Sequence, residues 1–266
     1  MIPKIIHYVW IGGAPMPELA VRCIASWKKY MPNWEYKRWD EDSLTRVLNQ
    51  LIPNPYHEGR GVNRSWLDYM PTYVRQAYEA QKFAFVSDYV RLWALEQYGG
   101  LYMDVDFEVY RPFDDLMDKY PAFAGYEGSK YNPVMMGVIA SEPHGAWVRD
   151  MLETYQVRKF ILLDGRLDMT PNTAYFYERM KERGFVADGI EKDVYVNSEF
   201  FLHVLPVHYF CPGLTTGENI RNEETYCEHM KLGSWDTRKT WRSYVVRMVG
   251  PKMKTLLIKW KRRILG

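Results

Sequence analysis

Two aspartates one residue apart, Asp104 and Asp106, are the side chains whose spacing most directly suggests chemistry. They follow the apolar run Leu101-Tyr102-Met103, which is typical of a short strand. Because side chains alternate between the faces of a strand, both carboxylates are expected on the same side. Like charges held that close repel unless a cation lies between them, and Mg²⁺ or Mn²⁺ with oxygen ligands is the usual solution. The pair predicts a metal-dependent enzyme that acts on a nucleotide-activated substrate.

The surroundings of this pair favour a site over a chance match, which a bare Asp-X-Asp often is. Gly99-Gly100 ends the preceding helix pattern, and the carboxyl ends of strands in α/β sheets are where such sheets bind ligands. Upstream, Asp88 and Arg91 share one helix face, and the simplest interpretation of them is a surface ion pair. Six apolar side chains nevertheless favour partial burial of that pair: Phe83, Phe85, Val86, Leu92, Trp93 and Leu95.

The chain resembles glycosyltransferase family 32 in several segments. These are residues 84–91 followed by 98–106, which resemble its sugar-binding DXD region, and residues 2–13, 26–40 and 229–235. The resemblance covers most of residues 1–125 and a block near 225–236, whereas the middle matches loosely. That family contains bacterial capsule and lipopolysaccharide enzymes and yeast Golgi mannosyltransferases. The glucosyltransferase domain of the large clostridial toxins is related to it.

The resemblance implies roles for the residues of the DXD region. Asp106 is the direct metal ligand, and Asp104 contacts the ribose, or the metal through water. The metal, Mn²⁺ or Mg²⁺, acts as a Lewis acid on the departing diphosphate. Asp88 and Arg91 hold the donor-sugar hydroxyls and the phosphate region, for which a planar guanidinium is well suited. Asn132 is expected to contact the donor or the acceptor. The family implies retention of the anomeric configuration, without an assigned nucleophile.

Further roles fall on the two ends of the chain. Val9 and Trp10 correspond to residues that line the base pocket, with the Trp10 ring against the nucleobase. The alternative for Trp10 is a core aromatic at a strand end. His229, Ser234 and Trp235 correspond to a flap that closes over the diphosphate. Since imidazole suits Mn²⁺, His229 is expected to be a third metal ligand beside Asp104 and Asp106.

Composition indicates an ordinary globular protein: 47% of the 266 residues are hydrophobic and 26% charged. Three cysteines without C-x-x-C spacing, at positions 23, 211 and 227, favour reduced thiols in the cytosol. The chain enters a strand directly after Met1, so we expect no signal peptide. No window reaches the roughly 18 uninterrupted apolar residues of a transmembrane helix. These features favour a bacterial cytoplasmic enzyme.

Hydrophobic periodicity predicts strands that alternate with helices. Strands are expected over 4–11, 34–39, 101–105, 121–126 and 134–140, with short pieces in 194–210, and helices over 18–30, 72–98, 143–156 and 172–183. Such alternation implies the α/β class with one Rossmann-like, mainly parallel sheet flanked by helices. The resemblance makes this a GT-A fold, with a catalytic domain over 1–237. We expect His7, in the first strand, to be structural.

The last 29 residues, 238–266, form a basic tail. Ten of the 35 Lys and Arg residues lie there with no acidic residue, whereas the rest of the chain holds 25 basic and 33 acidic residues. Apolar residues recur at helical spacing, namely Met253, Leu256, Leu257, Trp260 and Ile264. This pattern predicts an amphipathic helix on an anionic membrane surface. The alternative is a terminal helix packed on the domain. No nucleic-acid-binding module accompanies the charge, so no nucleic-acid partner is expected.

These features predict a metal-dependent retaining glycosyltransferase located in the cytoplasm and peripherally associated with the inner face of the cell membrane. It would transfer a sugar from a nucleotide-sugar donor, with a UDP-sugar favoured, to a lipid-linked oligosaccharide in capsule, O-antigen or exopolysaccharide synthesis. One alternative is a toxin-type or effector-type enzyme that modifies proteins. Others are a non-catalytic nucleotide-sugar-binding subunit and a nucleotidyltransferase, which would release pyrophosphate.

Overall fold

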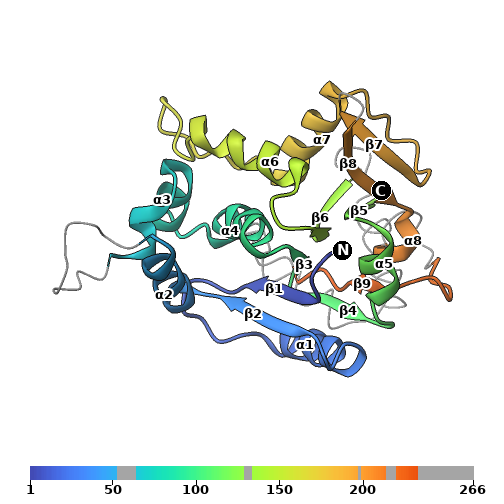
Figure 1. Cartoon of the computed structure of the whole chain (residues 1–266). Coiled ribbons are helices and arrows are strands. Elements are labelled where there is room, and N and C mark those ends of the chain that lie inside the picture. Colours follow the sequence, from blue (N-terminus) through green and yellow to red (C-terminus); the bar gives the residue numbers. More distant parts are fainter. Residues whose placement is uncertain (53–63, 129–133, 197–198, 214–219, 233–266) are drawn as a thin grey trace, which may run out of the picture. The chain divides into compact units, whose positions relative to one another are not determined.

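The computed structural model describes residues 1–52, 64–128, 134–196, 199–213 and 220–232. Within these ranges the strands are β1 Ile5–Val9, β2 Glu35–Trp39, β3 Gly100–Met103, β4 Phe107–Val109, β5 Ala122–Tyr126, β6 Val134–Ser141, β7 Lys192–Val196, β8 Glu199–Leu205 and β9 Cys227–His229. The helices are α1 Glu18–Tyr30, α2 Glu41–Leu51, the 3₁₀ turn η1 Trp66–Tyr69, α3 Thr72–Glu79, α4 Phe83–Tyr98, α5 Asp114–Lys119, α6 Ala146–Val157, α7 Asn172–Glu182 and α8 Val207–Phe210. Figure 1 shows their arrangement.

One seven-stranded sheet, in the order β2-β1-β3-β6-β5-β8-β7, is accompanied by the small sheet β4-β9. Pairing is parallel between β1 and β2, β1 and β3, and β5 and β8. It is antiparallel between β3 and β6, β5 and β6, and β7 and β8. The connections from β5 to β6 and from β7 to β8 are too short for the crossover that parallel neighbours need. The expected α/β class is confirmed, with antiparallel strands added to the parallel group.

Each face of the large sheet carries its own hydrophobic cluster. Alternation along β3 separates them, because Tyr102 belongs to one cluster while Leu101 and Met103 belong to the other. The Tyr102 face is covered by α2, α3, α4, α6 and α7. The opposite face is covered by α1, α5, α8 and the small sheet. The helix that carries Asp88 and Arg91 therefore packs on the face toward which Tyr102 points.

The single helix expected over 72–98 is two helices, α3 and α4, so that prediction is wrong. Between them Gln81 adopts a left-handed conformation with φ 56°, and the Lys82 N–H donates to the Ala77 carbonyl at 2.8 Å. This is the geometry with which helices commonly end. The helix expected over 18–30 is confirmed by α1.

His7 has the structural role expected of it. Its ring is fully buried, donates from Nε2 to the Gly99 carbonyl at 2.8 Å, and accepts the Trp39 indole N–H at Nδ1 over 3.1 Å. Burial lowers the pKa of His7 to about 4. The neutral ring thus ties β1 to β2 and to the end of α4.

Residues 1–232 form one compact unit. No helix in the described part of the chain is long and apolar enough to cross a membrane. Cys23, Cys211 and Cys227 are buried, free thiols, as expected. The tail over 238–266 lies outside the described residues, so its amphipathic helix and the boundary at 237 stay predictions.

Candidate active site

The two aspartates of the DXD motif lie in a turn between β3 and β4. Strand β3 ends at Met103, and the Phe107 N–H donates to the Asp104 carbonyl at 3.2 Å. The Asp104 N–H still donates to the Gly137 carbonyl of β6 at 2.8 Å. The prediction that both carboxylates project from one strand face is therefore wrong. The turn directs the two side chains to different partners.

Asp104 joins the pair on α4 through the Arg91 guanidinium. Arg91 Nη2 lies 3.0 Å from Asp88 Oδ1 and 3.4 Å from Asp104 Oδ1. The Tyr102 hydroxyl donates to Asp104 Oδ1 at 2.6 Å, and the guanidinium lies over the Tyr102 ring, 4.5 Å from its centroid. Arg91 Nη1 also donates to the Met136 carbonyl at 2.6 Å. Arg91 is thus held between two carboxylates. This agrees with the predicted burial of the pair, because a buried cation needs charged partners.

Burial shapes the ionisation of this group. It raises the pKa of Asp88 to about 6, although the Arg91 cation opposes the shift. Burial likewise raises the pKa of Asp104, again against the attraction of Arg91. The backbone N–H of Asn172, at the start of α7, acts in the same direction as Arg91 and lowers the pKa of Asp88. One guanidinium therefore serves the buried carboxyl of Asp88 and the half-buried carboxyl of Asp104, and hydroxyl donors or a further cation would stabilise their charged forms.

Asp106 points toward the C-terminal block. Its Oδ2 accepts the Leu232 N–H at 2.7 Å and lies 3.2 Å from His229 Nε2. Strands β4 and β9 pair Phe107 with His229, and the two rings stack at 4.6 Å with an interplanar angle of 5°. The predicted proximity of His229 to the DXD motif is present in the structure. Burial opposes ionisation of both groups, but their mutual bond lowers the pKa of Asp106 and raises that of His229.

Asp106 and His229 could supply two of the ligands of a divalent ion. Adjacent ligands of an octahedral ion with bonds of about 2.1 Å lie about 3 Å apart, and Asp106 Oδ2 and His229 Nε2 are separated by 3.2 Å. No group of three metal-binding side chains is assembled among the described residues. Asp104 is occupied by Tyr102 and Arg91, so its contact with a metal stays a prediction. A carboxylate and an imidazole, together with water and substrate phosphate, suit Mn²⁺ better than Mg²⁺, which prefers oxygen ligands.

The expected nucleotide loop follows β1. Val9 is buried, and Trp10 is half-buried with its indole N–H donating to the Ala14 carbonyl at 2.7 Å. The Gly12 N–H donates to Glu41 Oε1 at 2.8 Å. Gly12 has φ +97°, and a Cβ there would lie 2.4 Å from the Phe83 ring. Only glycine fits this close approach, which places the loop against the first residue of α4.

Glu127, immediately after β5, is a site residue that the sequence reasoning missed. Burial raises the pKa of its carboxyl, and its charged neighbours are His229, Asp104 and Lys231. The signal was present, since Glu127 follows a predicted strand just as Asp104 does. Asn132, Ser234 and Trp235 lie outside the described residues, so their roles stay predictions.

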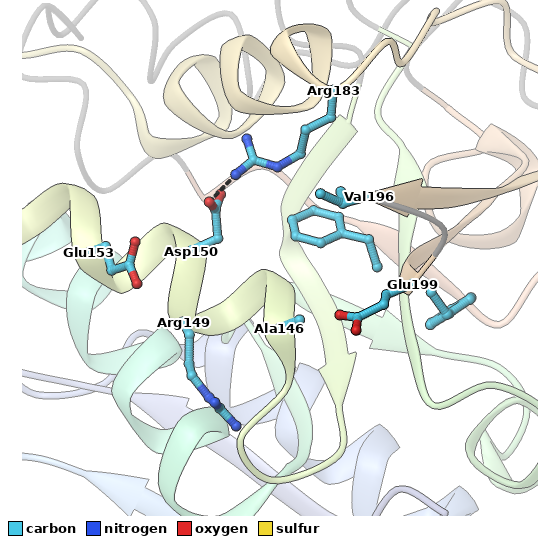
Figure 2. Close-up of a pocket in the computed structure, with 9 residues that line it drawn as sticks. Ala146, Arg149, Asp150, Glu153, Arg183, Val196 and Glu199 are labelled. Carbon is cyan, nitrogen blue, oxygen red and sulfur yellow. Dashed lines mark hydrogen bonds and ion pairs between the residues drawn. The ribbon is translucent and has the colours of Figure 1, made fainter.

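A pocket of about 300 Å³ lies elsewhere, beside α6, β7 and β8 (Figure 2). Figure 2 shows Asp150 paired with Arg183 at its edge. The pocket is lined by Ala146, Arg149, Asp150, Glu153, Arg183, Val196, Glu199, Phe200 and Phe201. It contains none of the predicted site residues, so it does not define the donor site.

Residues 17–123 match the family described as the glycosyltransferase sugar-binding region containing a DXD motif. The matched segment covers less than half of the chain. It contains the Asp88–Arg91 pair and both aspartates of the turn. The match therefore includes the site residues on α4 and in the turn after β3, whereas His229 lies outside the matched segment.

Two curated relatives illustrate the similarity. Inositol phosphoceramide mannosyltransferase 1 of Schizosaccharomyces pombe is 29% identical over 121 residues, which cover 44% of this chain and 32% of that protein. Subversion of eukaryotic traffic protein A of Legionella pneumophila is 26% identical over 132 residues, 45% of this chain and 20% of that protein. The chain therefore spans a third or less of the length of either.

Among solved structures, a glycosyltransferase involved in the glycosylation of the major capsid of PBCV-1 superimposes with a TM-score of 0.42 at 12% identity. The superposition covers 86% of this chain and 94% of that one. A UDP-bound glycosyltransferase domain from the YGT toxin gives a TM-score of 0.36 at 12% identity, with 70% and 69% covered.

Proposed function

We propose that this protein is a metal-dependent retaining glycosyltransferase that uses a nucleotide-sugar donor, with a UDP-sugar favoured. The observation that carries the proposal is the position of Arg91 between Asp88 and Asp104, inside the family's sugar-binding region. Beside it, Asp106 and His229 form a pair whose spacing suits a cation. The Arg91 group would hold the sugar and the phosphates, and the Asp106–His229 pair would hold the metal. Departure of a nucleoside diphosphate requires both, because negative charge develops on the diphosphate as it leaves.

Each described side chain has a part in this reaction. Asp106 and His229 would hold the ion, which supplies Lewis-acid stabilisation of the leaving diphosphate. Arg91 would place its positive charge beside phosphate or sugar oxygens, and Asp88 would accept donor-sugar hydroxyls. The half-buried Trp10 ring offers a face for the base. Because Arg91 is held by Ser87, Met136 and the two carboxylates, these contacts are formed before the donor binds.

For the acceptor we propose a lipid-linked saccharide at the inner face of the cell membrane, extended during polysaccharide synthesis. Two observations support a lipid: two similar fungal proteins are named inositol phosphoceramide mannosyltransferases, and the tail is strongly basic. A protein acceptor, as in the toxin-type enzymes that the sequence resembles, is the second candidate. Labelled sugar recovered in the organic phase of a membrane extract would support the first, and label on protein the second.

The donor reaction is tested by the release of nucleoside diphosphate from a panel of UDP- and GDP-sugars, with and without Mn²⁺. We expect slow, metal-dependent hydrolysis of one donor, reduced about 100-fold or more in Asp106→Asn because the variant weakens the metal site. Asp118→Asn, an exposed acid on α5, is the matched control and should keep full activity. Equal release by Asp106→Asn and the wild type would contradict the role of the motif.

A further inference from the structure

Exposed apolar side chains gather in the connection between α6 and α7. Five of the 13 large hydrophobic side chains exposed in the described ranges lie within 157–169, namely Val157, Ile161, Leu162, Leu163 and Met169. Leu163 is 102% exposed, so nothing in the unit covers it. Figure 1 shows this connection at the end of α6, beside α3. Residues 158–169 are called the apolar hairpin below.

The tip of the apolar hairpin is an ordered turn. Ile161 and Leu167 form an antiparallel bridge, and the Leu162 N–H donates to the Arg166 carbonyl at 2.8 Å. The Gly165 N–H closes the turn on the Leu162 carbonyl at 2.9 Å, with Gly165 at φ +80°. Turns normally carry polar residues, because they face water. Here the fold instead presents two adjacent leucines to the solvent.

The base of the apolar hairpin is firmly anchored. Phe160 is fully buried, with ring centroids 5.4 Å from Tyr73 and 5.1 Å from Phe85. The backbone N–H groups of Phe160 and Ile161 both donate to Gln76 Oε1, at 2.9 and 3.1 Å. The exposure of the tip is therefore not a result of loose packing. An anchored base with an exposed apolar tip is the form expected of a loop that inserts its tip into an apolar environment.

The base also lies next to the candidate active site. Arg158 pairs with Asp168 at 3.3 Å, and the same cation acts on the carboxyl of Asp88. Asn172, which begins α7 shortly after the hairpin, also favours the charged form of Asp88 through its backbone N–H. Arg158 and Asn172 therefore connect the base of the apolar hairpin to Asp88, which is proposed to bind the donor sugar.

We propose that the apolar hairpin enters the boundary between headgroups and acyl chains of an anionic lipid bilayer. Leu162 and Leu163 would lie among the acyl chains, while the exposed cation Lys159 would meet the headgroups. Arg166 balances the charge of Asp164, the acidic residue of the tip, at 2.6 Å. A lipid bilayer can surround a protruding side chain such as Leu163 more completely than a flat protein surface can. The basic tail of the same chain is predicted from its sequence to favour anionic lipid, so the bilayer is the occupant that both features fit.

The position of the tip can be read with a fluorophore. Because the native thiols are all buried, Leu163→Cys provides a single accessible site for an environment-sensitive label on the full chain. With vesicles of phosphatidylcholine and phosphatidylglycerol, we expect a blue shift and brighter emission from position 163. A label at Ile190→Cys, where the native side chain is 65% exposed, should not respond. Absence of a shift at position 163, whether or not the protein sediments with the vesicles, would overturn the proposal.

A second variant tests the contribution of the tip to binding. Leu162→Ser with Leu163→Ser should lower co-sedimentation with these vesicles about tenfold or more, with little change in melting temperature because both side chains are exposed. The matched control, Val186→Ser with Ile190→Ser, removes two other exposed apolar side chains, 67% and 65% exposed, and should bind as the wild type does. Unchanged binding by the tip variant would contradict the proposal. So would a dimer in gel filtration that only the tip variant disrupts, since the tip would then join two copies.

Discussion

Arg91 is the residue on which the donor site depends, because it contacts two carboxylates and two backbone carbonyls at once. The sequence predicted its pairing with Asp88 from their spacing on one helix face. It did not predict that Asp104 would join them, because the turn after β3 leaves no periodic pattern. His229 was expected at the motif only through the family resemblance, since its partner Asp106 lies 123 positions away.

Replacing Arg91 with lysine tests whether geometry or charge matters at this point. Arg91→Lys keeps the positive charge but loses the planar fork that reaches Asp88, Asp104 and Met136 together. We expect kcat/KM for donor hydrolysis to fall about 10- to 100-fold. Arg149→Lys, at an exposed position on α6, should change it little. A wild-type kcat/KM in Arg91→Lys would show that charge alone is sufficient.

His7 makes stability depend on pH. Its pKa is about 4 in the folded protein, below the ordinary 6.5, so below pH 6.5 the unfolded chain binds a proton that the native ring does not. The free energy of unfolding should therefore decrease as the pH falls from 6.5 toward 4, by on the order of 3 kcal/mol in total. Urea denaturation at several pH values measures this decrease. In His7→Gln the decrease should be smaller, and an identical slope would contradict the assignment.

At the scale of elements, the sequence predicted those with strong periodicity and missed those that depend on tertiary contacts. Helix α1 matches its predicted bounds. The break between α3 and α4 was missed because the residues around Gln81 are ordinary helix formers, so no local signal marks it. The three-residue strands β4 and β9 were also missed, because they are too short for a pattern and pair across the length of the chain.

Strand β6 leaves room for the motif turn through Gly137. A Cβ at this position would lie 2.8 Å from the Phe107 ring and 2.9 Å from Asp104 Oδ2. Gly137→Ala should therefore displace Asp104 and lower kcat/KM for donor hydrolysis about tenfold or more, because a shift of about 1 Å is costly in a catalytic group. The comparison variant is Gly125→Ala, which crowds the core ring of Phe210 instead.

The two glycine variants separate stability from function. Both should lower the melting temperature, because each forces a core contact to move. Only Gly137→Ala should lose activity beyond what its unfolded fraction explains. If both variants lost activity in proportion to stability, the role of Gly137 in placing Asp104 would be rejected.

At the scale of the whole molecule, the site is assembled from segments far apart in the sequence. The loop after β1, helix α4, the turn after β3 and strand β9 all contribute, and only the fold brings them together. The α/β class could be predicted because alternation of strands and helices is a local pattern. The antiparallel pairing of β3 with β6 could not, because these strands are far apart in the sequence. Glu127 was missed although it follows a predicted strand. The apolar hairpin shows the same limit, since its exposure is a property of the folded unit alone.

The identity of the products formed from the donor tests the proposed glycosyl transfer most directly. The wild-type protein would be incubated with the preferred nucleotide sugar and Mn²⁺, and the products separated by anion-exchange chromatography. We predict a nucleoside diphosphate with free sugar, or with glycosylated acceptor when membranes are added. A nucleoside monophosphate with sugar phosphate, or the absence of both turnover and donor binding across the panel, would contradict a glycosyltransferase.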